Sequence, residues 1–115
     1  MKTVQNNSEP ASKKKLEKST LVLKLERNQK DVGQLRNQLN SYICEPRTYT
    51  LFERMETLKR GLDTLSNSNL QMILTLKERK KNINDYMDNV RHQIAEFKKL
   101  QRGVEEYMKG LRGSY

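Results

Sequence analysis

The sequence predicts an all-α protein: a helical hairpin with a long second helix, suited to coiled-coil or helical-bundle assembly. One observation is a heptad repeat of apolar residues that runs from Leu51 to Leu111 without a slip in register. Another is a shorter heptad pattern from Leu21 to Tyr42. A strict seven-residue repeat keeps one apolar face turned towards a neighbouring helix. Pro46 separates the two patterns, and proline disfavours helical geometry at its own position and at the residue before it.

The first helix is predicted over residues 13–43, after a polar N-terminal tail at 1–12 that we expect to be disordered. Residues 26–40 are rich in Glu, Gln, Arg, Lys and Leu, which are good helix formers. The a and d positions of this helix form a first-helix seam, which comprises Leu21, Leu25, Val32, Leu35 and Leu39.

Residues 44–50 are predicted to form the connecting turn between the helices. Thr50 and Glu53 then have the spacing of a capping box, which favours a helix start at this point. The second helix is predicted over 51–111, a length of about 90 Å at 1.5 Å per residue, with a short C-terminal tail at 112–115.

The second helix carries a broad apolar stripe over heptad positions a, d and e, which is typical of a helix that touches two or more neighbours. The first helix is only about half as long, so much of this stripe would stay open without a helical partner or a second copy of the chain. The predicted partner-binding seam comprises Leu51, Met55, Leu58, Leu62, Leu65, Asn69, Met72, Ile73, Leu76, Ile83, Tyr86, Val90, Ile94, Phe97, Leu100 and Val104.

Residues 66–69 are a possible weak point in this helix, because Ser and Asn favour turns. A loop there would give a three-helix bundle instead of a hairpin. The heptad keeps its phase across the four residues, which favours a continuous helix. Asn69 falls on the seam, where a polar residue can fix the alignment of helices, and Asn28 on the first-helix seam is its candidate partner. Gln93 also falls on the seam.

The segment 70–76 is apolar nearly all round, because Leu70 and Leu74 lie outside the a/d/e stripe. A helix that is apolar on every side is expected to be buried on every side. The segment is therefore either the centre of a multi-helix junction or core beneath the first helix, and the pattern does not separate the two.

The chain has a net charge of +9, so acidic partners are favoured: nucleic acid, an anionic membrane surface or an acidic protein. The acidic residues Glu78, Asp85 and Asp88 are interspersed with the basic ones, however, as on an ordinary solvated face. The possible polyanion contacts are Lys13, Lys14, Lys15, Lys77, Lys80 and Lys81.

The residues needed for catalysis or metal binding are scarce. With one histidine, His92, and one cysteine, Cys44, the chain has too few ligands of these types for a conventional zinc site, and no disulfide within the chain is possible. No Gly-rich phosphate loop occurs, and no base lies near Cys44 in sequence. We expect no enzyme activity, cofactor or metal. We also expect no integral membrane segment and a cytoplasmic or nuclear location.

These patterns predict a non-enzymatic structural or scaffold subunit that assembles through its helices into a homo- or hetero-oligomeric complex, with a tethering or spacing role. One alternative is a basic helical protein associated with nucleic acid or chromatin. Another is a membrane-trafficking or tethering component. The sequence does not separate self-assembly from assembly with other chains.

Overall fold

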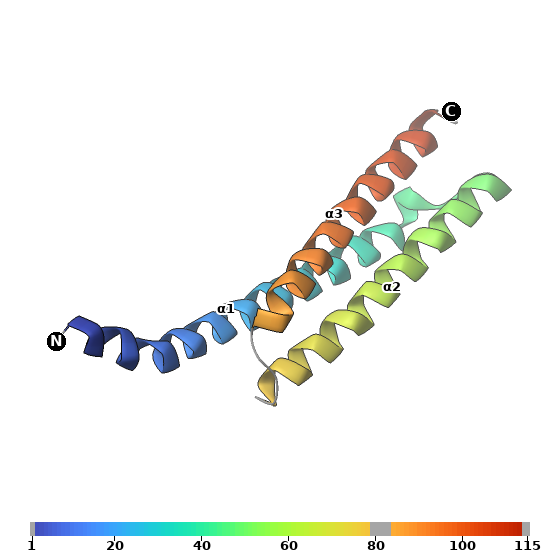
Figure 1. The fold of residues 1–115 in the computed structure, drawn as a ribbon. Coiled ribbons are helices and arrows are strands. Elements are labelled where there is room, and N and C mark those ends of the chain that lie inside the picture. Colours follow the sequence, from blue (N-terminus) through green and yellow to red (C-terminus); the bar gives the residue numbers. More distant parts are fainter. Residues whose placement is uncertain (1, 79–83, 114–115) are drawn as a thin grey trace.

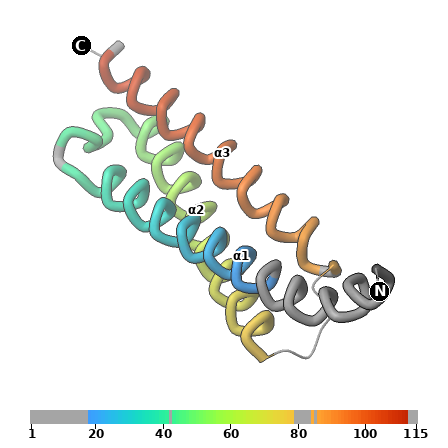
Figure 2. Tube along the Cα trace, turned by 90° about the vertical axis from the view of Figure 1, so that its left-hand side faces the viewer, coloured from blue at the N-terminus to red at the C-terminus, as the bar shows by residue number. Residues whose placement is uncertain are grey.

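A computed structural model describes the backbone of residues 2–78 and 84–113, and the side chains of 18–112 within those ranges except 42 and 85. Three α-helices make up nearly all of it: α1 (Lys2–Leu39), α2 (Tyr49–Lys77) and α3 (Asn84–Gly113). One turn of 3-10 helix, η1 (Tyr42–Cys44), lies between α1 and α2. The helices lie side by side along most of their length, as Figures 1 and 2 show. The predicted all-α fold class is confirmed, and the described residues contain no strand.

Helix α1 is longer than the helix predicted over 13–43. It begins at Lys2, so residues 2–12, predicted to be a disordered tail, are helical. It ends at Leu39, four residues earlier than predicted. The five residues of the first-helix seam are all buried, in agreement with a face that packs on the core.

Helix α2 begins at Tyr49, with Thr48 as its N-cap. The side-chain oxygen of Thr48 accepts a hydrogen bond from the backbone N–H of Leu51 at 3.1 Å. This bond satisfies one of the amide groups that the first turn of a helix leaves without a partner. The cap is therefore two residues upstream of Thr50, the residue at which the sequence predicts it.

The structure differs from the predicted continuous helix over 51–111. Helix α2 ends at Lys77, where the backbone N–H of Glu78 donates to carbonyl oxygens of the last turn, and α3 begins at Asn84. The predicted weak point at 66–69 is helical within α2. Folding back buries one half of the apolar seam against the other half, whereas a single long helix would leave much of it in water.

Two polar contacts show that α2 and α3 run antiparallel. Asn69 of α2 accepts a hydrogen bond from Gln93 of α3, and Arg54, nearer the start of α2, forms an ion pair with Glu106, nearer the end of α3. Helix α1 is antiparallel to α2 and runs in the same direction as α3 (Figure 1). The molecule is consequently a rod with principal extents of 71 × 24 × 18 Å.

Two glycines let α2 and α3 approach closely at matching points. A Cβ atom at Gly61 would lie 2.7 Å from a terminal methyl carbon of Leu100, and one at Gly103 would lie 2.8 Å from a terminal methyl carbon of Leu58. Real Cβ atoms essentially never approach another heavy atom this closely. Each glycine thus leaves space that a leucine of the facing helix fills.

The core consists of two apolar clusters arranged along the rod. The first, at the end where η1 lies, contains Val32, Leu35, Leu39, Cys44, Met55, Leu58, Leu62, Leu65, Val104, Tyr107 and Leu111. The second, at the end of α2 nearest Lys77, contains Leu21, Leu25, Ile73, Leu76, Tyr86 and Val90. Both clusters draw residues from all three helices. No helix among the described residues is long and apolar enough to cross a membrane.

Candidate interaction surfaces and a buried polar layer

The predicted partner-binding seam lies inside the bundle. Ten of its residues are buried: Met55, Leu58, Leu62, Leu65, Asn69, Ile73, Leu76, Tyr86, Val90 and Val104. Five more pack partly buried against the two apolar clusters: Leu51, Met72, Ile94, Phe97 and Leu100. Ile83 lies outside the described residues. Helix α1 and the fold-back of α3 supply the neighbours that the sequence assigns to another chain, so these side chains are not available to a partner in this conformation.

A buried polar layer, formed by Asn28, Gln29, Ser66, Asn69 and Gln93, crosses the bundle between the two clusters. Gln93 Nε2 donates to Asn69 Oδ1 at 2.8 Å. Asn69 Nδ2 donates to Gln29 Oε1 at 3.3 Å, and Gln29 Nε2 donates to Ser66 Oγ at 2.8 Å. The chain of hydrogen bonds links all three helices through Asn69, whose exposed fraction is 0%.

The polar layer holds one orphaned group. Asn28 is only 4% exposed, and its side-chain Nδ2 is buried without a hydrogen-bond partner. An unsatisfied buried amide destabilises the folded state by about 1–3 kcal/mol. Sliding one helix past another would break the bonds of Asn69 and Gln93 as well, and would leave further amides unsatisfied. The layer therefore favours one axial alignment of the three helices.

Sequence reasoning located three residues of the polar layer but not their pairing. It placed Asn28, Asn69 and Gln93 on the seam and made Asn28 the candidate partner of Asn69. In the structure, Asn69 bonds to Gln29 and Gln93 instead. Gln29 was not predicted because it lies outside the a and d positions of the first helix. Its e position next to Asn28 could have indicated that it lies near the seam.

Tyr107 anchors the α1–α2 connection to α3. Its hydroxyl group donates a hydrogen bond of 2.7 Å to the backbone carbonyl oxygen of Cys44 in η1. Both residues are buried, and this burial raises the pKa of the Tyr107 phenol above its ordinary value of 10.0. The sequence carried no signal that joins these two residues, because the contact spans 63 positions.

Tyr107→Phe should lower the free energy of unfolding at pH 7 by about 1 kcal/mol, because it removes this buried hydrogen bond. A pH effect follows from the raised pKa. The unfolded chain ionises first as the pH passes 10, so the contribution of Tyr107 to stability is complete below pH 10 and is lost as the pH rises through the folded-state pKa. Urea unfolding should therefore show a smaller alkaline loss of stability for Tyr107→Phe than for wild type. An equal loss would contradict this assignment, and exposed Tyr49→Phe is the control.

Three exposed leucines form what we call the leucine surface: Leu23 of α1 and Leu70 and Leu74 of α2. Their exposed fractions are 53%, 47% and 50%. Leu70 and Leu74 are four residues apart and so lie on one side of α2. They are exposed, which does not match the expectation that the segment 70–76 is buried on every side.

Leu70 lies at the edge of α2 that adjoins α1. It stands seven residues after Asp63 and seven before Lys77, and these two residues form ion pairs with Arg36 and Glu26 of α1. Positions seven residues apart share one side of a helix. Leu70 therefore lies between two ion pairs along the junction of α1 and α2.

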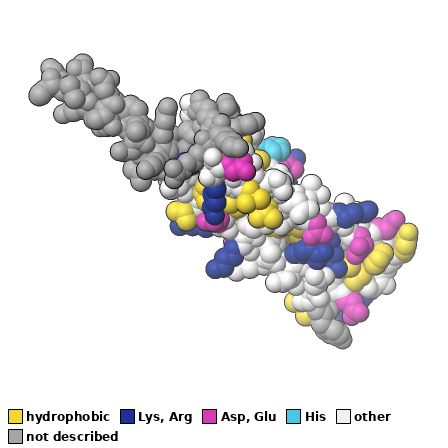
Figure 3. Space-filling model, turned by 90° about the horizontal axis from the view of Figure 1, so that it is seen from below, with side chains coloured by type: hydrophobic (Ala, Val, Ile, Leu, Met, Phe, Trp, Pro, Cys, Tyr) yellow, Lys and Arg dark blue, Asp and Glu magenta, His cyan; other side chains and the backbone are white. Residues whose placement is uncertain are grey.

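Leu23 lies beside a shallow groove of about 350 Å³ at the same junction. The groove is lined by Lys18, Ser19, Val22, Leu23, Leu76 and Lys77. Figure 3 shows one face of the molecule on which hydrophobic side chains alternate with Lys and Arg side chains. The groove combines apolar walls with two basic side chains, Lys18 and Lys77, of which Lys77 forms an ion pair with Glu26 of α1.

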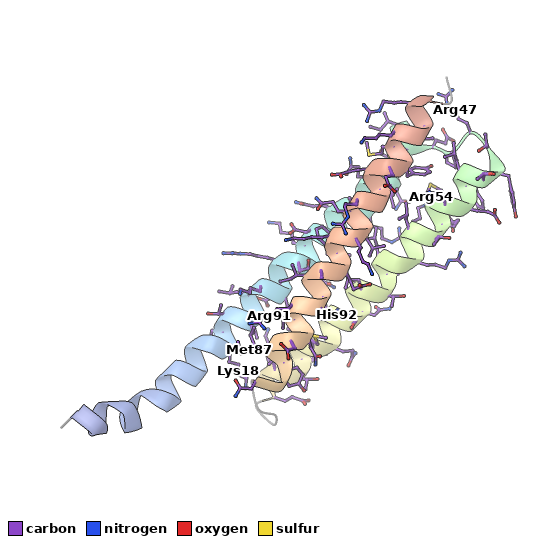
Figure 4. All side chains as sticks on the ribbon, turned by 45° about the horizontal axis from the view of Figure 1, so that its top comes forward. Lys18, Arg47, Arg54, Met87, Arg91 and His92 are labelled. Atoms are coloured by element: carbon purple, nitrogen blue, oxygen red, sulfur yellow. The ribbon has the colours of Figure 1, made fainter. Side chains whose placement is uncertain are left out.

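A second exposed apolar group lies at the opposite end of the rod, around η1. Ile43 is 72% exposed, Tyr49 74% and Phe52 46%. The rings of Tyr49 and Phe52 stack, with centroids 6.5 Å apart. Figure 4 labels Arg47 and Arg54 at this end, and Lys18, Met87 and Arg91 at the other. Basic side chains thus flank the apolar residues at both ends.

The predicted polyanion contacts are only partly visible. The side chains of Lys13, Lys14, Lys15, Lys80 and Lys81 lie outside the described residues. The Lys77 side chain is exposed, and its Nζ lies 3.6 Å from Oε2 of Glu26. Other described basic side chains are also paired with acids, for example Arg91 with Asp88 and Lys99 with Glu96. Binding to nucleic acid or to another polyanion therefore stays a prediction.

His92 and Cys44 are the residues that the sequence analysis considered for metal binding or catalysis. No group of three or more His, Cys, Asp or Glu side chains that could hold a metal ion occurs among the described residues. His92 is exposed on α3 (Figure 4), and Cys44 is buried. Comparisons with family models, curated proteins and solved structures find no match to this chain. The surfaces described above are therefore the basis for a functional proposal.

Proposed function

We propose that this chain is a structural subunit that binds a helix of another protein along its leucine surface and so holds or spaces partners within a complex. The observation that carries the proposal is the exposure of Leu23, Leu70 and Leu74 on a bundle whose predicted seam is buried. Exposed apolar residues gathered at one junction of a small protein are typical of an interaction site.

The partner we propose is an amphipathic helix with acidic residues beside its apolar stripe. Helices that bind in grooves present apolar anchors three, four or seven residues apart. Leu70, Leu74 and the groove beside Leu23 would receive such anchors. Lys18 and Lys77 line the groove, and the chain carries a net charge of +9, so an acidic helix is the complementary partner. A tethering role at a membrane would need the same surface and stays a prediction.

The test compares two variants that add the same negative charge. Leu70→Asp with Leu74→Asp changes the leucine surface, and Ala95→Asp with Gln101→Asp changes exposed positions of α3. Proteins that cross-link to the wild-type chain in cells should also cross-link to the α3 variant. We expect their cross-linked yield to fall by about tenfold or more in the leucine variant. Circular dichroism checks that both variants stay folded.

Equal retention of cross-linked proteins by both variants would refute the leucine surface as the binding site. If only the α3 variant retains a cross-linked partner, that partner can be identified by mass spectrometry. A synthetic peptide of its interacting segment should be helical and acidic. A basic or extended segment would contradict the partner chemistry we propose.

A further inference from the structure

The heptad register continues without a break from α2 into α3, although the chain folds back between them. Asn69 at position a and Gln93 at position d both lie twelve residues from Lys81, and they bond to each other. Gly61 and Leu100, which approach each other closely across the two helices, lie twenty and nineteen residues from the same point. A hairpin needs only that each helix turn its own apolar face inwards. It does not require one register to pass through the connection.

The sequence of the connection also lacks the usual helix breakers. Residues 78–84 read Glu-Arg-Lys-Lys-Asn-Ile-Asn, without Gly or Pro. Ile83 falls at position a and Arg79 at position d, so the heptad continues here too. Asn82 and Asn84 favour turns, as Ser and Asn do at 66–69, but the register is that of a helix that runs straight on.

We propose that two copies of the chain exchange α3: α2 and α3 of each copy join into one long helix, and α3 packs on α1 and α2 of the second copy. Exchange of an identical element is a known route to dimers, because the contacts of the monomer are remade between copies. Here the pairs Asn69–Gln93 and Arg54–Glu106 would form between copies. The second copy fits the surface vacated by α3 because its α3 has the same sequence.

The register makes the exchanged dimer symmetric. Asn69 and Gln93 are equidistant from Lys81, and Arg54 and Glu106 lie 27 and 25 residues from it, so the two long helices would run antiparallel about a two-fold axis close to that residue. Each would span roughly 95 Å from Tyr49 to Gly113, compared with 71 Å for the longest extent of the single chain.

Helix α1 limits how the two copies can meet. Lys18 and Val22 lie beside Leu76 and Lys77 at the end of α2, and the N-terminal part of α1 extends past that end (Figure 1). In the dimer, the two α1 helices would meet near Lys18. The residues before it would then lie outside the shared groove.

The charge of the connection predicts that salt controls the exchange. Residues 77–85, which are centred on the two-fold axis, contain four basic residues and two acidic residues, a net charge of +2 per copy. Two such segments would meet at the two-fold axis and repel each other. The Debye length, over which salt screens the repulsion between charges, falls from about 10 Å at 0.1 M salt to about 3 Å at 1 M. The dimer should therefore form mainly at high ionic strength.

The experiment uses the full chain, refolded from urea at high protein concentration, because α3 must leave its core contacts before it can exchange. Light scattering after size-exclusion chromatography should show a dimer fraction that rises by about fivefold or more between 0.1 and 1 M salt. Absence of a dimer for the wild-type chain under both conditions would overturn the proposal.

Two pairs of cysteines then distinguish exchange from simple association, both in a Cys44→Ala background. The reporter pair is Arg54→Cys with Glu106→Cys, which joins α2 to α3. The control pair is Arg36→Cys with Asp63→Cys, which joins α1 to α2 and is not exchanged. The isolated dimer of each double-cysteine variant is treated with a short bismaleimide, which cross-links neighbouring thiols, and is then run on a denaturing gel.

We expect the reporter pair to give a covalent dimer and the control pair to give a monomer linked within the chain. A reporter pair linked within the chain would mean that the copies associate without exchange, and would refute the proposal. At 1 M salt, where the added charges are screened, Leu70→Asp with Leu74→Asp should leave the dimer fraction unchanged, since the leucine surface takes no part in the exchange. Failure of one proposal is thus distinguishable from failure of the other.

Discussion

Leu62→Ala is expected to lower the free energy of unfolding by about 3–4 kcal/mol, because Leu62 is fully buried where all three helices meet. Truncation there removes apolar contacts and leaves a cavity. A domain of this size has a total stability of roughly 5–15 kcal/mol. The variant should therefore unfold at a clearly lower urea concentration, as followed by the helical signal in circular dichroism.

Leu70→Ala is the matched control for this prediction. It makes the same chemical change on the same helix, at a side chain that is 47% exposed. We expect a loss of less than about 1 kcal/mol, since less apolar surface is removed from a buried environment and no closed cavity forms. Similar losses for the two variants would contradict the assignment of Leu62 to the core and of Leu70 to the surface.

Asn69→Leu is expected to lower the free energy of unfolding by about 2–4 kcal/mol, because it leaves Nε2 of Gln93 and Oε1 of Gln29 without their hydrogen bonds to Asn69. Replacing Asn28, Asn69 and Gln93 together by Leu should have the opposite sign. It removes the orphaned Nδ2 of Asn28 and replaces the buried amides by apolar groups, and we expect a gain of about 1–3 kcal/mol.

The single and triple variants are compared by urea unfolding under identical conditions. A triple variant less stable than Asn69→Leu would show that the polar layer contributes more than its hydrogen bonds. Equal stability of wild type and Asn69→Leu would mean that the amides find other partners, and would remove the argument that this layer fixes the alignment of the helices.

The heptad predicted which side chains face the core, and the structure shows why this part of the prediction was accessible. Leu25, Leu62 and Val104 are buried because each lies on the apolar stripe of its helix, and that stripe packs against the neighbouring helices. That property depends on local spacing alone. It holds whether the neighbouring helix belongs to the same chain or to another.

The fold-back could not be located from the same pattern. The register continues through residues 78–84, and those residues include no Gly or Pro to mark a turn. The composition that suggested a turn, Ser and Asn at 66–69, lies inside helix α2. There Asn69 and Ser66 form hydrogen bonds in the polar layer. Polar residues that form hydrogen bonds in a core resemble loop residues when only the sequence is known.

The candidate surfaces depended on packing that the sequence does not state. Leu70 and Leu74 belong to an apolar segment that suggested complete burial, yet the bundle contains only three helices and leaves that side of α2 uncovered. The bond between Tyr107 and Cys44 also arises only once α3 has folded back along η1. Exposure and long-range pairing follow from the number and order of the helices, which the heptad does not fix.

The most direct test of the central claim, that one chain satisfies its own apolar seam, is light scattering with circular dichroism on the natively purified protein during dilution. We predict a strongly helical monomer of 13.6 kDa that keeps its helical signal down to the lowest measurable concentration. Loss of helix on dilution, or a dimer that never yields a monomer, would show that the seam needs a second chain and would contradict the three-helix bundle described above.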